Sequence, residues 1–261
     1  MKNKVKTNQN YKNCLHCLIK EISQQKGRKL KIVCDWDEVI QTRNSYLHYQ
    51  NLQKNSPSSL PFSNEYLKVF WKERWVSYDE QSCYFTNESL REEIAKIRNN
   101  SDAYVKQPFL SPAKELLLAL KDELIEKLIF LSAYNHDNMP CGDQRKINKF
   151  QVTFENFPQC KFELFPFSPQ KESNFFKWQS IQQHNSDFDL FIDDNPNIIK
   201  SAQENLPSDK LFALPDYYEH NEHVKGFNVY HFKVGLSTLQ DEDFAKSAQE
   251  YQVKQMEVSP K

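Results

Sequence analysis

Glycine is scarce in this chain, with four residues among 261. Glycine-rich loops let the backbone approach a phosphate closely in dinucleotide-binding turns and in P-loops. The four glycines are too far apart to form such a loop, because they stand at positions 27, 142, 226 and 235. Any phosphate must therefore be held by side chains, a metal ion and helix N-termini.

Long apolar runs and an excess of one charge are also missing. No segment approaches the roughly 20 apolar residues that a membrane helix needs, and residues 1–12 lack the apolar stretch of a secretory signal. The formal net charge is −1, so no global field attracts nucleic acid. Six cysteines without a disulfide-like rhythm suit a reducing compartment. We expect a cytoplasmic protein with no membrane partner and no strong nucleic-acid signal; the sequence does not specify the oligomeric state.

Three short apolar runs end in side chains that carry oxygen atoms. Continuous apolar runs are typical of parallel strands buried on both faces, and open α/β sheets place their sites at the C-terminal ends of such strands. The runs and the side chains that follow them are residues 30–34 with Asp35 and Asp37, residues 128–131 with Ser132, and residues 188–192 with Asp193 and Asp194.

Four of these side chains are aspartates. Asp35, Asp37, Asp193 and Asp194 would repel one another at one sheet edge unless a cation held them. Oxygen ligands suit a hard divalent ion, so the pattern predicts a Mg²⁺ site. The fold class that we expect is α/β, with a Rossmann-like parallel sheet as its core.

The order of the motifs resembles the haloacid dehalogenase-like (HAD) phosphohydrolase superfamily. The resemblance rests on Asp35-x-Asp37, then Ser132, then a lysine, then Asp193-Asp194. It implies that Asp35 is a nucleophile that forms an aspartyl-phosphate. On an extended chain, side chains two residues apart point to the same side, so we expect Asp37 on the side of Asp35. The family pattern makes Asp37 the general acid and base. Ser132 would donate to a phosphate oxygen, and Asp35, Asp37, Asp193 and Asp194 would hold the metal.

Plainer structural roles compete with some of these assignments. Ser132 could satisfy a backbone group at a strand end, and Asp193 or Asp194 could cap the helix that follows. The lysine of the third motif is best matched by Lys171, which residues 168–169 place in the first turn of a helix. The other candidates are Lys177, Lys146 and Lys149.

Glu38 departs from the family pattern. Many members carry glycine directly after the second aspartate, where it permits a tight unwinding just past the strand. Glutamate is compatible with hydrolase activity, but it alters the expected geometry of this loop and the access of substrate.

An insertion after the first motif matches the place of a C1 cap in the family, which closes over the site. Its aromatic side chains could stack on a nucleobase or fill the core of the cap. The segment around Lys177-Trp178 and residues 214–221 resembles 5'(3')-deoxyribonucleotidase-type members. The predicted divisions are an N-terminal helical extension (1–27), the core (28–40 and 108–240), the helical cap (41–107) and a polar tail (241–261). The aromatic residues are Phe70, Trp71, Trp75, Tyr78, Tyr84 and Phe85.

Cys14 and Cys17 stand in a Cys-x-x-Cys arrangement near the N-terminus. A zinc knuckle would need a second pair of ligands nearby, so we interpret them as packing residues of a helix. The elements that we expect are helices over residues 11–25, 111–124, 168–184 and 196–205, an irregular stretch over 139–167 with a strand near 162–165, and strands over 211–214 and 229–232.

Together these observations predict a Mg²⁺-dependent phosphomonoester hydrolase that acts through an aspartyl-phosphate, with a nucleoside monophosphate as a candidate substrate. The alternatives are a phosphotransferase and a non-catalytic phosphate-binding or protein-interaction member of the same fold.

Overall fold

The computed structural model describes residues 11–41, 109–135, 141–167, 177–215, 226 and 228–234. Nearly all of the predicted cap, Lys171 and the predicted polar tail lie outside these residues, as does the aromatic cluster of the cap.

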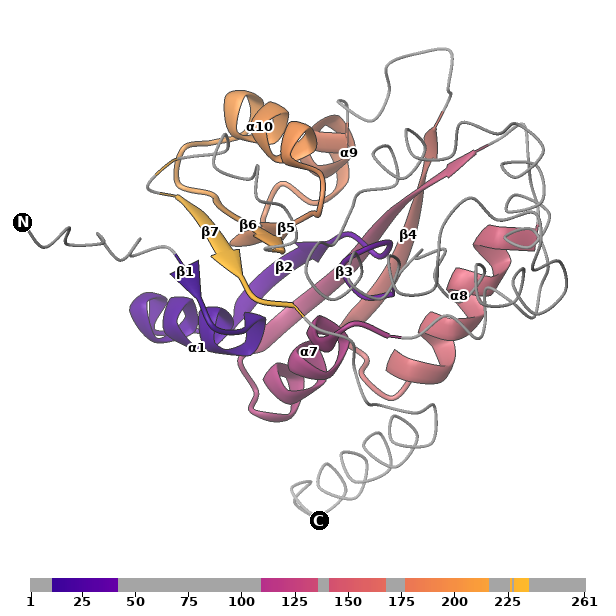
Figure 1. Ribbon diagram of the computed structural model, residues 1–261, viewed down its shortest axis with the longest axis horizontal. Helices are drawn as coiled ribbons and strands as arrows, with labels where there is room; N and C mark the ends of the chain where they lie inside the picture. Colours follow the sequence, from indigo (N-terminus) through magenta and orange to yellow (C-terminus); the bar gives the residue numbers. More distant parts are fainter. Residues whose placement is uncertain are drawn as a thin grey trace, which may run out of the picture.

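The described residues form one parallel sheet of seven strands in the order β1-β7-β6-β5-β2-β3-β4 (Figure 1). The prediction of an α/β fold with a Rossmann-like parallel sheet is confirmed. The strands are β1 (Tyr11–Lys12), β2 (Leu30–Cys34), β3 (Ile125–Asn135), β4 (Cys160–Phe167), β5 (Leu190–Ile192), β6 (Leu211–Pro215) and β7 (Val229–Phe232).

Helices cover both faces of this sheet and give two separate cores. On β2, Ile32 and Cys34 belong to the core beneath the first group of helices, while Val33 points to the second. Successive strand side chains alternate between faces, so a strand buried on both faces must be apolar throughout. The first group is α1 (Leu15–Lys26), α7 (Ser111–Lys121) and α8 (Cys141–Phe154), and the second is α9 (Lys177–His184) and α10 (Pro196–Asn205) (Figure 1).

The helix predicted over residues 11–25 is confirmed from Leu15 onward as α1, which buries Leu15, Leu18, Ile19 and Ile22, whereas residues 11–12 form strand β1. These residues recur at the spacing of one helix face. The helix ends at Gly27, whose φ of 63° is the left-handed conformation that glycine adopts readily. Because α1 packs against α7 and β1 joins the sheet beside β7, this part of the predicted extension lies with the core.

The prediction of an irregular stretch after residue 139 is wrong for its first half, which forms α8. The segment carries Gly142 near its start and several β-branched or aromatic residues, all weak helix formers. Tertiary packing overrides these propensities, because Phe150 and Phe154 are buried against the sheet. The predicted strand near 162–165 is confirmed within β4.

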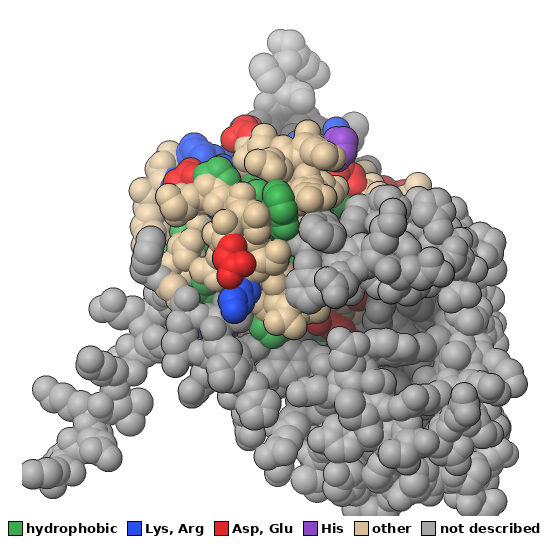
Figure 2. All heavy atoms as spheres, turned by 90° about the horizontal axis from the view of Figure 1, so that it is seen from above, with side chains coloured by type: hydrophobic (Ala, Val, Ile, Leu, Met, Phe, Trp, Pro, Cys, Tyr) green, Lys and Arg blue, Asp and Glu red, His purple; other side chains and the backbone are tan. Residues whose placement is uncertain are grey.

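The described part of the chain has neither a large surface patch of one charge on the face in view (Figure 2) nor a helix that could cross a membrane. Acidic and basic side chains are interspersed on the face seen from above, and no large patch of one sign gathers there (Figure 2). Across the described ranges, no helix is both long enough and apolar enough to cross a membrane.

Asp189 ties the N-terminal ends of β2 and β5 together. Its buried carboxylate accepts hydrogen bonds from both Arg28 guanidinium nitrogens, at 2.7 and 2.9 Å, and from the Lys31 backbone N–H at 2.9 Å. Lys26 Nζ lies 3.1 Å away. Burial alone would raise the pKa of Asp189, but these donors outweigh it and hold the pKa below its ordinary value.

We expect Asp189→Asn to lower the free energy of unfolding by about 1–3 kcal/mol near neutral pH, because a buried charged acceptor is lost. A lowered folded-state pKa stabilises above the unfolded pKa of about 3.9 and stops doing so as the pH falls through the folded value. Urea unfolding of mutant and wild type should therefore differ most above pH 4 and converge below it. Asp187→Asn, which removes an exposed partner of Lys31, is the control and should change little. A constant difference down to pH 2 would contradict the ionic role.

Candidate active site

The site lies where the chain reverses its direction of travel across the sheet. From β2 the chain proceeds to β3 and β4 on one side, and it then returns to β5, β6 and β7 on the other. Such a switch point opens a crevice at the carboxyl ends of the two strands that flank it, here β2 and β5. Cys34 pairs with Ile192 in register, and the Asp35 N–H donates to the Ile192 carbonyl at 2.8 Å. The register therefore places Asp35 beside Asp193.

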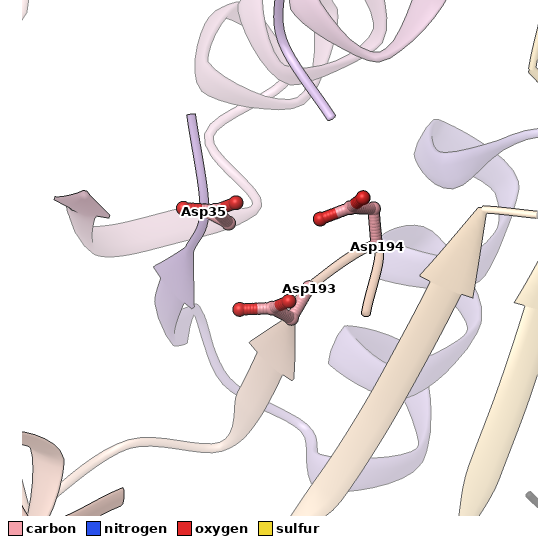
Figure 3. Close-up of side chains that lie close together, drawn as sticks. All are labelled: Asp35, Asp193 and Asp194. Atoms are coloured by element: carbon pink, nitrogen blue, oxygen red, sulfur yellow. The ribbon is translucent and has the colours of Figure 1, made fainter. Parts of the chain in front are cut away.

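Three carboxylates meet in this crevice. Asp35 and Asp193 are buried, Asp194 is half-buried, and one oxygen from each lies within 4.8 Å of the others. Figure 3 shows Asp35 just past the end of β2, with Asp193 and Asp194 following β5. Asp193 Oδ1 accepts a hydrogen bond from the Asn195 N–H at 3.0 Å. Asn195 itself caps α10 by accepting from the Asn197 N–H, so helix capping at this corner is provided by Asn195.

Lys177 is the cation of this cluster. Its Nζ donates to Asp35 Oδ1 and to Asp193 Oδ2, both at 2.7 Å, and its side chain is 3% exposed. Burial alone would lower the pKa of Lys177, but the charges of Asp193 and Asp35 outweigh it and raise the pKa above its ordinary value. Lys171, which we favoured for this role, lies outside the described residues.

Burial and mutual repulsion act on the two aspartates after β5. Burial raises the pKa of Asp193 to about 6; Lys177 opposes this shift, and Asp35 adds to it. The pKa of Asp194 is raised well above its ordinary value, first by burial and then by the charges of Asp193, Asp35 and Glu38. Burial is the main cause of both shifts, and neighbouring carboxylates add to it. An added cation would favour the ionised forms.

A second buried lysine serves the other aspartate of the first motif. Lys146 Nζ, from α8, lies 2.5 Å from Asp37 Oδ2 and 3.0 Å from Ser132 Oγ. Ser132 is fully buried on β3, and Asp37 is 8% exposed. Ser132 lies within β3, which continues to Asn135 and does not end at Ser132 as the sequence suggested. Its hydroxyl and the second aspartate are joined through one ammonium group. Lys149, the remaining candidate, has its Nζ 4.1 Å from the centroid of the Phe109 ring.

Trp36 fixes the turn between the two aspartates. Its ring is fully buried and packs edge-to-face on Phe130 and Phe162, with centroids 5.2 and 5.5 Å away. The indole N–H donates to Gln41 Oε1 at 3.1 Å. The chain bends at Trp36, so the aspartates on either side of it reach different lysines: Asp35 contacts Lys177, and Asp37 contacts Lys146.

Glu38 adopts a left-handed backbone conformation with a φ of 58°. This is the conformation that glycine would supply at no cost, and a non-glycine residue loses roughly 1–2 kcal/mol there. The turn holds it in place, because the Glu38 N–H donates to the Gln41 carbonyl at 2.8 Å and the Ile40 N–H to the Trp36 carbonyl at 2.9 Å. The loop after Asp37 thus has the unwinding expected of glycine although glutamate is present.

Asp35, Asp193 and Asp194 fit a small divalent cation. They offer only oxygen donors, which Mg²⁺ prefers. Lys177 binds Oδ1 of Asp35 and Oδ2 of Asp193, and the Asn195 N–H binds Oδ1 of Asp193. A carboxylate oxygen that accepts one hydrogen bond keeps a further lone pair for a cation. Among the described residues, these three aspartates are the group of acidic, histidine or cysteine side chains that lie close enough together to share one ion.

Comparison with known proteins adds little to this geometry. No family model and no curated protein matches the sequence. One similar solved structure is a provisionally assigned haloacid dehalogenase-like hydrolase from Burkholderia xenovorans LB400. The likeness covers 82% of this chain and 96% of that chain, with 11% sequence identity and a TM-score of 0.42. At that level the likeness carries no information about chemistry, so the site is interpreted from its own residues.

We expect Lys177→Met to lower the free energy of unfolding by about 3–5 kcal/mol in buffer containing EDTA, because it leaves buried carboxylates without their cation. Asp193→Asn should lower the free energy of unfolding less in the Lys177→Met variant than in the wild type, because the neutral amide that replaces the carboxylate needs no cationic partner. Urea unfolding of the two single variants and the double variant measures this coupling. Lys29→Met, which breaks an exposed ion pair with Glu123, is the control and should change little. Strictly additive effects would show that the ion pair does not hold the site together.

Proposed function

We propose that this protein is a phosphomonoester hydrolase of the HAD superfamily that acts through an aspartyl-phosphate on Asp35. The observation that carries the proposal is the position of Asp35 at the switch point, held by Lys177 beside Asp193 and followed two residues later by Asp37. A buried carboxylate with a cation on one side and an acid two residues away is the arrangement that nucleophilic attack on phosphorus requires.

Each polar side chain has a distinct role in this chemistry. The Asp35 carboxylate attacks phosphorus, and Lys177 orients that carboxylate through its hydrogen bond to Oδ1. Asp37 protonates the leaving oxygen and then takes a proton from the water that hydrolyses the acyl-phosphate. Ser132 and Lys146 donate to the phosphoryl oxygens, and Lys146 also balances the charge on Asp37.

Asp35, Asp193 and Asp194 would hold Mg²⁺, with the Asp37 backbone carbonyl as a further ligand in the pattern of the superfamily. The ion would reduce the repulsion between a negative nucleophile and a negative phosphate. The raised pKa values of Asp193 and Asp194 support a site that gains from additional positive charge.

A nucleoside monophosphate is the substrate class that the resemblance to deoxyribonucleotidase-type members favours, and it stays a proposal. The residues expected to select the leaving group belong to the predicted cap, outside the described residues. Two other functions are compatible with the same site: transfer of the phosphoryl group to an acceptor other than water, and phosphate binding without turnover. A panel of phosphomonoesters, assayed with and without alcohol acceptors, separates the three.

We expect Asp35→Asn to retain the fold and to lose phosphate release by at least about a thousandfold, because an amide cannot attack phosphorus. Far-UV circular dichroism checks the fold, and inorganic phosphate release from p-nitrophenyl phosphate checks turnover. Asp209→Asn is the matched control, since Asp209 is 73% exposed and precedes β6, at the end of the strands opposite to the site. Wild-type turnover by well-folded Asp35→Asn would overturn the assignment.

We expect Mg²⁺ to raise the Tm of EDTA-treated protein through binding to the native state, and Ca²⁺ to support phosphate release poorly because its coordination shell is larger and looser. Asp193→Asn should lose the Mg²⁺-induced shift in Tm. Differential scanning fluorimetry gives this reading without any substrate. Full turnover after rigorous chelation, or an unchanged Tm at millimolar Mg²⁺, would contradict the proposed metal site.

We expect Asp37→Asn to lower kcat for an alkyl phosphate by about a hundredfold or more, and to lower it much less for p-nitrophenyl phosphate. The reason is that p-nitrophenolate leaves readily without a proton, whereas an alkoxide does not. Steady-state kinetics on both substrates measure the difference. Equal losses would argue that Asp37 positions Lys146 rather than acting as the acid.

A further inference from the structure

Cys14 and Cys17 form a pair of thiols at the start of α1, far in the sequence from the motifs of the proposed site. Their Sγ atoms lie 2.6 Å apart, and the Cys14 thiol donates to the Cys17 sulfur. Cys14 is the N-cap of α1, where its sulfur accepts from the Cys17 N–H at 3.2 Å. Sulfurs at this distance need little movement to form a disulfide, whose bond length is about 2.05 Å.

The turn that carries the two cysteines is anchored by two contacts, one to α7 and one to Asp122, the residue that follows α7. The Leu15 N–H donates to Glu115 Oε2 at 2.6 Å, and His16 Nε2 lies 2.9 Å from Asp122 Oδ2. Leu15 is fully buried in the core. The two sulfurs are therefore kept in proximity by tertiary contacts, and they do not meet by chance in a loose segment.

The two thiols differ in exposure. Cys17 is exposed and Cys14 is half-buried, whereas Cys34 and Cys160, the other cysteines with described side chains, are buried. Burial, the hydrogen bond to Cys17 and the charge of Glu115 raise the pKa of Cys14 to about 11, against the smaller lowering effect of the Cys17 N–H. Besides Cys17, the titratable groups near it are Glu115 on α7 and His16, which is paired with Asp122.

We propose that Cys14 and Cys17 are a dithiol–disulfide exchange site, with low-molecular-weight disulfides of the glutathione type as its substrates. Cys17 is the attacking thiol because soluble disulfides can reach it. Cys14 is the resolving thiol because it is shielded and already in contact with the Cys17 sulfur.

The exchange balances in two steps. The Cys17 thiolate attacks one sulfur of the small disulfide, whose S–S bond breaks and releases one thiolate. Cys14 then loses its proton to the released thiolate and attacks the Cys17 sulfur. The mixed disulfide breaks and expels the second small thiolate, which takes up the proton that Cys17 had lost. The two cysteines are oxidised to one disulfide, and one molecule of small disulfide is reduced to two thiols.

Two other readings of this pair make different predictions. If the cysteines only pack the helix, their sulfurs would stay reduced in the presence of a small disulfide. A zinc site would need further ligands beside the two cysteines. Among the described residues, the side chains close enough together to share an ion are the three aspartates of the other site.

The test uses the whole reduced protein, incubated with oxidised glutathione, quenched with N-ethylmaleimide and digested with trypsin. Cleavage after Lys12 and Lys20 releases residues 13–20, a peptide that holds both cysteines and no other. We expect this peptide to lose about 2 Da through an intramolecular disulfide. Recovery of the peptide with two maleimides after excess oxidised glutathione would overturn the proposal.

Two serine variants assign the roles. Cys14→Ser keeps an effective N-cap residue, so α1 is preserved, and it should accumulate a stable glutathione adduct on Cys17. Cys17→Ser should accumulate at least tenfold less adduct on Cys14. Equal adducts on the two variants would overturn the assignment of attacking and resolving thiols. None of these readings depends on phosphate release, so failure here and failure of the proposed hydrolase function can be told apart.

Discussion

The buried ammonium group of Lys177 is the interaction on which the site depends. Asp35 and Asp193 are brought side by side by the pairing of β2 with β5, and without a cation two buried carboxylates would not both stay ionised. Lys177 donates to both at 2.7 Å, so it offsets the repulsion that the sheet register creates. The same contact holds the carboxylate of Asp35, the proposed nucleophile, in place. Stability and proposed chemistry therefore rest on one ion-paired triad.

Lys146 has the same role for Asp37, the second aspartate of the first motif. It joins Asp37 to Ser132, so each aspartate of the first motif has its own buried lysine from a different helix. Because both lysines are already paired with aspartates, a phosphate dianion would also need the proposed metal ion to offset the negative charge of the site. Trp36 holds the intervening turn from the core side, and Glu38 accepts a strained conformation so that the turn can close.

Much of this arrangement could be predicted from the sequence because it is local. The apolar runs before Asp35, Ser132 and Asp193 indicated buried parallel strands, and their polar ends indicated the site edge. Asn195-Pro196 marked the start of α10, which the structure confirms. For α7 the expected Ser111 cap is shifted, since Leu110 is the N-cap and Pro112 follows one residue inside the helix.

The identity of the lysines could not be predicted, because it depends on contacts between distant residues. Lys177 meets Asp35 across 142 positions, and no local signal distinguishes it from Lys171. Lys146 was one candidate among several because α8 has weak helix formers, so the helix that carries it was not expected. The apolar positions Ile147, Phe150 and Phe154, at helical spacing, were the signal that could have found it.

The most direct test of the central claim is chemical trapping of the acyl-phosphate. Protein mixed with a phosphomonoester and Mg²⁺, quenched in acid and reduced with borohydride should carry homoserine at position 35, because borohydride reduces an acyl-phosphate and leaves a free carboxylate intact. Peptide mass spectrometry locates the change. Homoserine at Asp35, dependent on substrate, is the result that the account predicts. Rapid phosphate release with no modification at Asp35, or with modification at a different carboxylate, would contradict it.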